Sequence, residues 1–165
     1  MNTVLFVCSG NTCRSPMAEA IFNDLIDDHP RLCEKGFQAR SAGTFAIDGA
    51  PMTQKALDAL DAIGIEVDHR HKARSFSAEI ADEAALILGV QEMVVEEILA
   101  LAPQVEDRTH TLRGYGEYVD GLVGNEQYDI EDPYRESAEV YIESAKQIKA
   151  AVEKVLERLE KEQEK

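Results

Sequence analysis

Residues 4–16 read Val4-Leu5-Phe6-Val7-Cys8-Ser9-Gly10-Asn11-Thr12-Cys13-Arg14-Ser15-Pro16, an apolar run followed by a short loop and a helix start. The four β-prone residues before Cys8 predict a buried strand that ends at this cysteine. Five residues separate Cys8 from Arg14, and Ser15 and Pro16 are typical of an N-cap and a first helical position. A strand, a loop and a helix N-terminus therefore follow one another directly.

This arrangement predicts a site for an oxyanion such as phosphate. Backbone N–H groups of the loop can point inward, the helix N-terminus adds partial positive charge, and the Arg14 guanidinium offers a bidentate fork. The same surroundings favour the thiolate form of a cysteine, so Cys8 is expected to attack a bound phosphoryl group. A lone cysteine would more often be an inert buried residue, and the whole string counts against that reading.

The string from Val7 to Pro16 closely resembles the signature loop of the low-molecular-weight protein tyrosine phosphatase family, which includes bacterial protein-arginine phosphatases. Three further strings match in the expected order, so the resemblance covers nearly the whole chain: Ser41-Ala42-Gly43-Thr44, His71-Lys72-Ala73-Arg74 and Asp132-Pro133-Tyr134. The resemblance implies hydrolysis of phosphorylated protein side chains through a cysteinyl-phosphate intermediate, with neither a metal ion nor another cofactor.

The resemblance also assigns roles to residues. The expected catalytic residues are Cys8, Arg14 and Asp132, with Asp132 protonating the leaving group and later activating water. By itself Asp132-Pro133 would be an ordinary turn, and Glu131 and Asp129 are interpreted as solvated charge. The expected phosphate- and substrate-binding residues are Ser9, Gly10, Asn11, Thr12, Cys13, Ser15 and Tyr134. By the resemblance, the Ser15 hydroxyl is also expected to donate to the Cys8 thiolate, which is compatible with its place as an N-cap. Expected support comes from Ser41 and His71, which with Asn11 match a bracing network in tyrosine-specific relatives, whereas Lys72 and Arg74 are expected at the surface.

Two residues carry open alternatives. Thr12 stands where tyrosine-specific members typically place a larger aliphatic residue and arginine phosphatases place threonine, whereas Tyr134 stands where the arginine branch often has phenylalanine. The resemblance therefore slightly favours phosphoarginine and keeps phosphotyrosine as a close alternative. Cys13 is equally compatible with a reversible disulfide to Cys8 and with a small apolar filler.

Two other functions use the same loop. Arsenate reductases coupled to thioredoxin need cysteines well downstream, and no cysteine follows Cys33. A non-catalytic module that binds phosphorylated residues would not need Cys8, Arg14 and Asp132 together. Both functions are therefore disfavoured.

Length, composition and charge limit the number of domains and the kinds of partner. A chain of 165 residues with 44% hydrophobic content predicts one domain, residues 1–165, with one core. The formal net charge of −15 argues against nonspecific binding to nucleic acid or to an anionic membrane. No long apolar span or leader is visible, and three cysteines form no disulfide framework, so a cytoplasmic location is expected. The partners are then phosphorylated proteins, and the pattern carries no signal of oligomeric state.

Strands are expected at residues 3–7, 37–42, 84–88 and 109–112, and helices after Ser15, after Pro51, at 94–102 and at 136–160. A long mobile loop is expected from Gly114 to Glu131. This alternation predicts a three-layer α/β/α sandwich with a four-stranded parallel sheet and the phosphate loop after the first strand.

Overall fold

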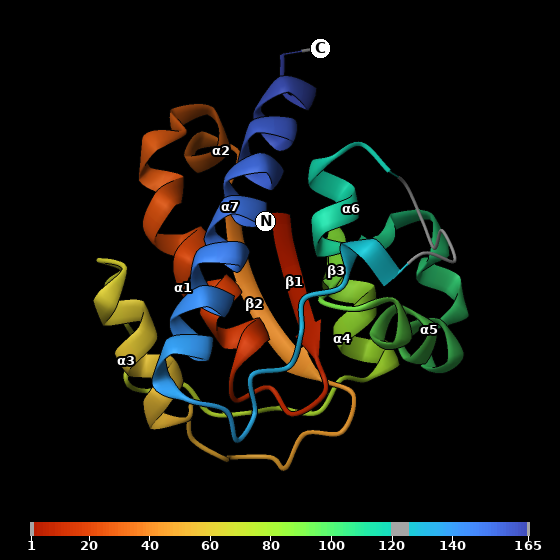
Figure 1. The fold of residues 1–165 in the computed structure, drawn as a ribbon. Helices are drawn as coiled ribbons and strands as arrows, with labels where there is room; N and C mark the ends of the chain where they lie inside the picture. Colours follow the sequence, from red (N-terminus) through yellow and green to blue (C-terminus); the bar gives the residue numbers. More distant parts are fainter. Residues whose placement is uncertain (1, 120–125, 165) are drawn as a thin grey trace.

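The computed structural model describes residues 2–119 and 126–164. Its centre is a four-stranded parallel sheet in the order β2-β1-β3-β4, which confirms the predicted fold class (Figure 1). The strands are β1 (Asn2–Cys8), β2 (Phe37–Gly43), β3 (Leu86–Gly89) and β4 (Thr109–Thr111).

Strand β1 is the axis of the sheet because it pairs on both sides. Its last residue, Cys8, lies opposite Gly43 of β2, and Val7 lies opposite Gly89 of β3. The carboxyl ends of three strands therefore meet at the point where Cys8 emerges. In open parallel sheets this edge is where ligands bind.

Helices cover both faces of the sheet. Their bounds are α1 (Arg14–Leu25), α2 (Pro30–Glu34), α3 (Gln54–Ala62), α4 (Ala78–Glu83), α5 (Glu92–Leu101), α6 (Leu112–Gly116) and α7 (Ala138–Glu162). Helices α1 and α7 lie side by side over one face, and α4 and α5 lie on the other side (Figure 1). Short 3-10 turns span Ile26–Asp28, Pro103–Arg108 and Glu126–Tyr128.

Apolar periodicity explains helices α1 and α7. In α1 the buried Ile21 and Phe22 face the sheet, and the Phe22 ring meets Phe6 of β1 edge to face with centroids 5.9 Å apart. Helix α7 begins after Ser137, whose hydroxyl accepts the Val140 N–H. Its buried residues recur at helical spacing, so one side of this long helix packs and the other stays polar. No helix among residues 2–119 and 126–164 is both long and apolar enough to cross a membrane.

The start of two helices differs from the expected one. Ser15 is not the N-cap of α1, because the helix begins at Arg14 and the Ser15 hydroxyl is engaged elsewhere. Helix α3 begins at Gln54 rather than Pro51, since the Thr53 hydroxyl accepts the Ala56 N–H and makes the cap.

The expected loop from Gly114 to Glu131 contains two short helical segments that the sequence did not predict. Helix α6 extends to Gly116, and the turn Glu126–Tyr128 follows later in the segment. Residues 120–125 of this expectation lie outside the described residues. Helices α2 and α4 were not expected, because they are short and have little periodic pattern.

Strand β2 ends against the loop after β1 so closely that it requires glycine. The Thr44 N–H donates to the Cys8 carbonyl at 3.0 Å, and the Phe45 N–H donates to the Ser9 carbonyl at 2.9 Å. A Cβ on Gly43 would stand 2.4 Å from the Ser9 carbonyl oxygen, which is backbone and cannot swing away. The loop can therefore take this position only because Gly43 has no side chain.

Replacing Gly43 with alanine is expected to destabilise the protein by about 1–3 kcal/mol, because backbone must shift to relieve the overlap. The shift should also displace the loop and slow alkylation of Cys8 by iodoacetate. Gly64→Ala is the matched control: its Cβ meets nothing within 4 Å, and its φ of +77° makes alanine cost about 1 kcal/mol. Urea unfolding and alkylation rates check both variants, and equal Cys8 reactivity in the two would contradict the prediction.

Candidate active site

The loop of residues 9–13 curls around the sulfur of Cys8. The Asn11 N–H donates to Cys8 Sγ at 3.2 Å, and Ser15 Oγ lies 2.9 Å from the same sulfur. Asn11 reaches this position with φ of +57°, a left-handed conformation that asparagine tolerates better than most residues. Donors aimed at a sulfur favour its anionic form, which is the state a nucleophile needs.

Asn11 is fully buried and is held by its neighbours through the side chain and the carbonyl. Its Nδ2 donates to Ser15 Oγ and to Ser41 Oγ, each at 2.9 Å. Its Oδ1 accepts the Arg74 N–H at 3.0 Å, and its carbonyl lies 2.8 Å from His71 Nε2. The structure therefore brings together Asn11, Ser41 and His71, the three residues that the sequence singled out for support.

Arg74 and Glu19 also belong to this network, although no role there was expected for either residue. Arg74 is half-buried rather than at the surface: besides its N–H, its Nε donates to the Ser41 carbonyl at 2.9 Å. Ser41 Oγ donates to Glu19 Oε1 at 2.5 Å. The one sequence signal for a supporting role of Arg74 was its place in the matching string His71–Arg74. Glu19 lies in no such string.

Arg14 faces the loop from the first turn of α1. Its side chain is 3% exposed, and its Nη1 donates to the Ile130 carbonyl at 2.8 Å. Its Nη2 lies 3.6 Å from Asp132 Oδ2, so the guanidinium and the carboxylate meet. A buried arginine beside backbone donors is a binding site for a tetrahedral oxyanion.

The segment that carries Asp132 is fastened to the sheet. The Ile130 N–H donates to the Val90 carbonyl at 2.9 Å, directly after β3. Asp129 was expected to be solvated charge, and this is wrong, because its Oδ1 accepts the Glu92 N–H at 2.8 Å at the start of α5. Asp132 Oδ1 accepts the Tyr134 N–H at 3.0 Å, and the Asp132 side chain is 50% exposed. The carboxylate is thus oriented and open to solvent.

These side chains surround a cavity of about 310 Å³ at the carboxyl end of β1. Its lining includes Cys8, Ser9, Gly10, Thr12, Cys13, Arg14, Phe45, Ile47, Ala50, Asp132 and Tyr134. Three large apolar side chains at this cavity are mostly exposed: Phe45 at 73%, Ile47 at 78% and Tyr134 at 57%. The cavity combines an anion-binding floor with apolar side chains that a larger substrate can contact.

Cys13 also lies in a polar cluster of its own at the side of this cavity. Its Sγ is 3.4 Å from Thr53 Oγ1 and 3.6 Å from the Tyr141 hydroxyl. Burial, helped by the hydrogen bond to Cys13, raises the pKa of Tyr141 to about 12. The backbone of Thr12 is anchored to the same region, since its carbonyl accepts the Thr53 N–H at 3.0 Å.

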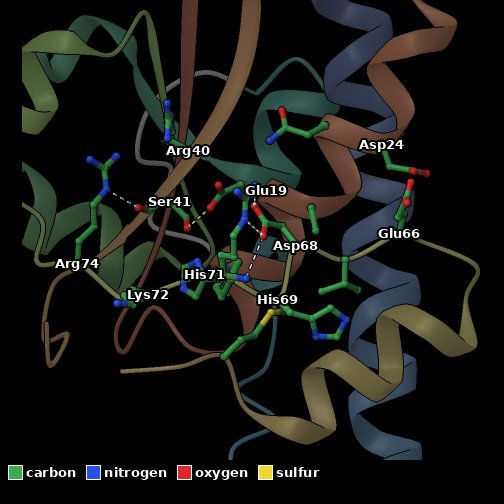
Figure 2. Close-up of a pocket in the computed structure, with 16 residues that line it drawn as sticks. Glu19, Asp24, Arg40, Ser41, Glu66, Asp68, His69, His71, Lys72 and Arg74 are labelled. Carbon is green, nitrogen blue, oxygen red and sulfur yellow. Dashed lines mark hydrogen bonds and ion pairs between the residues drawn. The ribbon is translucent and has the colours of Figure 1, made fainter. Parts of the chain in front are cut away.

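A larger cavity, of about 820 Å³, is partly lined by residues of the bracing network (Figure 2). Glu19, Ser41, His71 and Arg74 line it, and Cys8, Arg14 and Asp132 do not. The smaller cavity therefore holds the candidate chemistry, whereas the larger one exposes the network behind the loop to solvent.

Comparison with known proteins finds a matching family and similar solved structures. The family model described as "Low molecular weight phosphotyrosine protein phosphatase" matches residues 3–165. A protein-arginine-phosphatase of Geobacillus stearothermophilus is 34% identical over 164 residues, which are 97% of each chain. The solved arginine phosphatase of that organism covers 99% of this chain and 96% of its own, with a TM-score of 0.83 and 31% identity. A low molecular weight protein tyrosine phosphatase from T. tengcongensis covers 96% and 99%, with a TM-score of 0.82 and 33% identity.

The raised pKa of Tyr141 predicts a stability loss at high pH. Below about pH 10 the phenol is protonated in both states, and above it the unfolded chain loses its proton first. The free energy of unfolding should therefore fall between about pH 10 and 12, by on the order of 2 kcal/mol. Urea unfolding across this range should show the fall in the parent protein and in the control Tyr118→Phe, but a much smaller one in Tyr141→Phe. An equal fall in all three would contradict the prediction.

Proposed function

The chain belongs to the low molecular weight phosphotyrosine protein phosphatase family and is a protein phosphatase, and from this premise we propose that Cys8 is its nucleophile. Arg14 then binds the phosphate oxygens and Asp132 serves as acid and base. The observation that carries this proposal is that these three side chains line one cavity. Nucleophile, cation and carboxylate are the groups that phosphoryl transfer to a cysteine needs.

In the first half-reaction the Cys8 sulfur forms a bond to phosphorus while the bond from phosphorus to the substrate side chain breaks. Protonated Asp132 gives its proton to the departing atom, so the substrate leaves as a neutral group. The guanidinium of Arg14 and the backbone N–H groups of residues 9–13 hold the three phosphoryl oxygens. The product is a cysteinyl-phosphate.

In the second half-reaction water replaces the sulfur. Ionised Asp132 takes a proton from the water molecule, whose oxygen attacks phosphorus as the bond between sulfur and phosphorus breaks. Inorganic phosphate leaves, and the cysteine is restored as a thiolate. Support comes from the Asn11 N–H and the Ser15 hydroxyl, which lie beside the sulfur and stabilise it as a leaving group.

We propose phosphoarginine as the preferred substrate residue, with phosphotyrosine as the alternative. Thr12 lines the cavity, and a threonine leaves more room and more polarity beside the phosphorus than a larger aliphatic side chain would. Relatives that are 34% and 32% identical over nearly the full chain carry the name protein-arginine-phosphatase. Tyr134 can stack on a guanidinium or a ring, so it is compatible with both substrates.

We also propose that the enzyme acts in the cytoplasm on phosphorylated proteins. The mechanism needs a reduced cysteine, and Cys8, Cys13 and Cys33 are all free thiols. Reducing compartments keep such thiols from forming disulfides. A net charge of −15 favours protein substrates over nucleic acid as partners.

Asp132→Ala tests the general acid. Removing it should slow turnover of phenyl phosphate about 10²–10⁴-fold, because phenolate is a poor leaving group without a proton. p-Nitrophenyl phosphate has a better leaving group and should lose much less. Cys8→Ser is the negative control in both assays and should show no turnover. Equal losses for the two substrates in Asp132→Ala would remove this residue from the role.

Thr12→Ile tests the substrate preference. The variant should lower the ratio of kcat/KM for phosphoarginine peptides over phosphotyrosine peptides roughly tenfold or more, since one or two added carbons in a tight pocket are worth that much. Thr3→Ile, at the far end of β1, is the matched control and should leave the ratio unchanged. A higher kcat/KM of the parent enzyme for phosphotyrosine peptides would contradict the proposal and make phosphotyrosine the preferred substrate residue.

A further inference from the structure

The hydrogen-bond network behind Cys8 has a direction that its chemistry fixes. Asn11 Oδ1 accepts the Arg74 N–H, so its Nδ2 must face Ser15 and Ser41 and donate to both. Neither serine can then donate its hydroxyl hydrogen to Asn11. Each serine must have another acceptor for that hydrogen.

Ser41 gives its hydrogen to Glu19. The two oxygens are 2.5 Å apart, and an ionised carboxylate can only accept. Glu19 lies four residues after Ser15, so both side chains project from the same side of α1. Figure 2 shows Glu19 and Ser41 pointing toward one another at the larger cavity. With its hydrogen committed to Glu19, the Ser41 oxygen is available to accept from Asn11.

Ser15 completes the chain of bonds at the nucleophile. Its oxygen accepts from Asn11, and its own hydrogen can go to Cys8 Sγ at 2.9 Å or to the Ala42 carbonyl at 3.4 Å. The sulfur is nearer and, as a thiolate, is the stronger acceptor. The Ser15 hydrogen therefore points at Cys8 when Cys8 is ionised.

We infer that Glu19 is a positioning residue for the reaction at Cys8. By accepting the Ser41 hydrogen it keeps Ser41 as an acceptor, which holds the Asn11 side chain and keeps the Asn11 N–H aimed at the sulfur. This inference rests on the proposed role of Cys8 as nucleophile. Glu19 touches neither sulfur nor substrate, and it acts through Ser41 and Asn11.

The charge of Glu19 and its hydrogen bond act in opposite directions on Cys8. A second negative charge near a thiolate disfavours that thiolate, whereas a well-held donor network favours it. Other charged groups line the same cavity: Asp24, Arg40, Glu66, Asp68, His69, Arg70, His71, Lys72 and Arg74. Glutamine at position 19 keeps an oxygen that can accept from Ser41 and removes the charge. Alanine removes both the oxygen and the charge.

Glu19→Ala is expected to lower kcat for p-nitrophenyl phosphate about tenfold or more, which is the cost of losing one charge-assisted hydrogen bond. KM should change less than about twofold, because Glu19 does not contact the substrate. Glu19→Gln should restore kcat to within about threefold of the parent, because its amide oxygen still accepts from Ser41. Both variants lack the charge, so the pH midpoint for alkylation of Cys8 by iodoacetate should lie higher in Glu19→Ala than in Glu19→Gln. Asp24→Ala, which removes another carboxylate of α1 from the same cavity, is the matched control and should change neither.

A double-mutant cycle then tests the route. Ser41→Ala should reproduce the loss, and Ser41→Ala combined with Glu19→Ala should be no slower than either alone, because both interrupt one chain of bonds. Glu19→Met, whose thioether is only a weak acceptor, replaces Glu19→Ala should the alanine variant not fold.

Two results would overturn the inference: a folded Glu19→Ala with the parent's kcat and alkylation midpoint, or a Glu19→Gln as slow as Glu19→Ala. Different results would contradict the proposed function itself. In that case Cys8→Ser would keep turnover, and inorganic phosphate would not protect Cys8 of the parent protein from alkylation by iodoacetate.

Discussion

The site depends on one contact, the Asn11 N–H that points at the sulfur of Cys8. The contact exists because Asn11 takes a left-handed backbone conformation, which costs a non-glycine residue about 1 kcal/mol or more. Hydrogen bonds to its side chain and carbonyl, from α1, from β2 and from the segment around residues 71–74, outweigh that cost. Elements far apart in the chain thus hold one residue in the conformation that makes the loop an anion site.

The same constraint explains how a strongly acidic protein can bind an anionic substrate. With a net charge of −15 the overall field repels phosphate, so the attraction has to be local. In the proposed function, the loop amides and Arg14 supply this attraction at short range. Arg14 is buried and tied to the Ile130 carbonyl, so the segment bearing Asp132 is placed by the same guanidinium that faces the phosphate site.

Sequence reasoning reached those parts of the fold and the site that have local signatures. The apolar run before Cys8 and the periodic residues of α1 and α7 predicted their elements, and contiguity placed Cys8, Ser9 and Arg14 around one loop. Long-range relations had no such signature. Arg74 braces Asn11 through a backbone N–H, which any residue carries, and Glu19 meets Ser41 across 22 residues.

Ser15 had two expected roles with different outcomes. The helix cap that its position beside a proline suits does not form, whereas its hydroxyl lies 2.9 Å from the Cys8 sulfur, where the resemblance expects it. The partial exposure of Glu19 lowers the cost of placing its charge in this network. A carboxylate sealed in the core would lose several kcal/mol of hydration and would repel a thiolate at low dielectric. Half-buried on the wall of the larger cavity, Glu19 leaves part of its carboxylate accessible to solvent and still presents one oxygen to Ser41. Its charge therefore disfavours the thiolate less than the same charge would in the core.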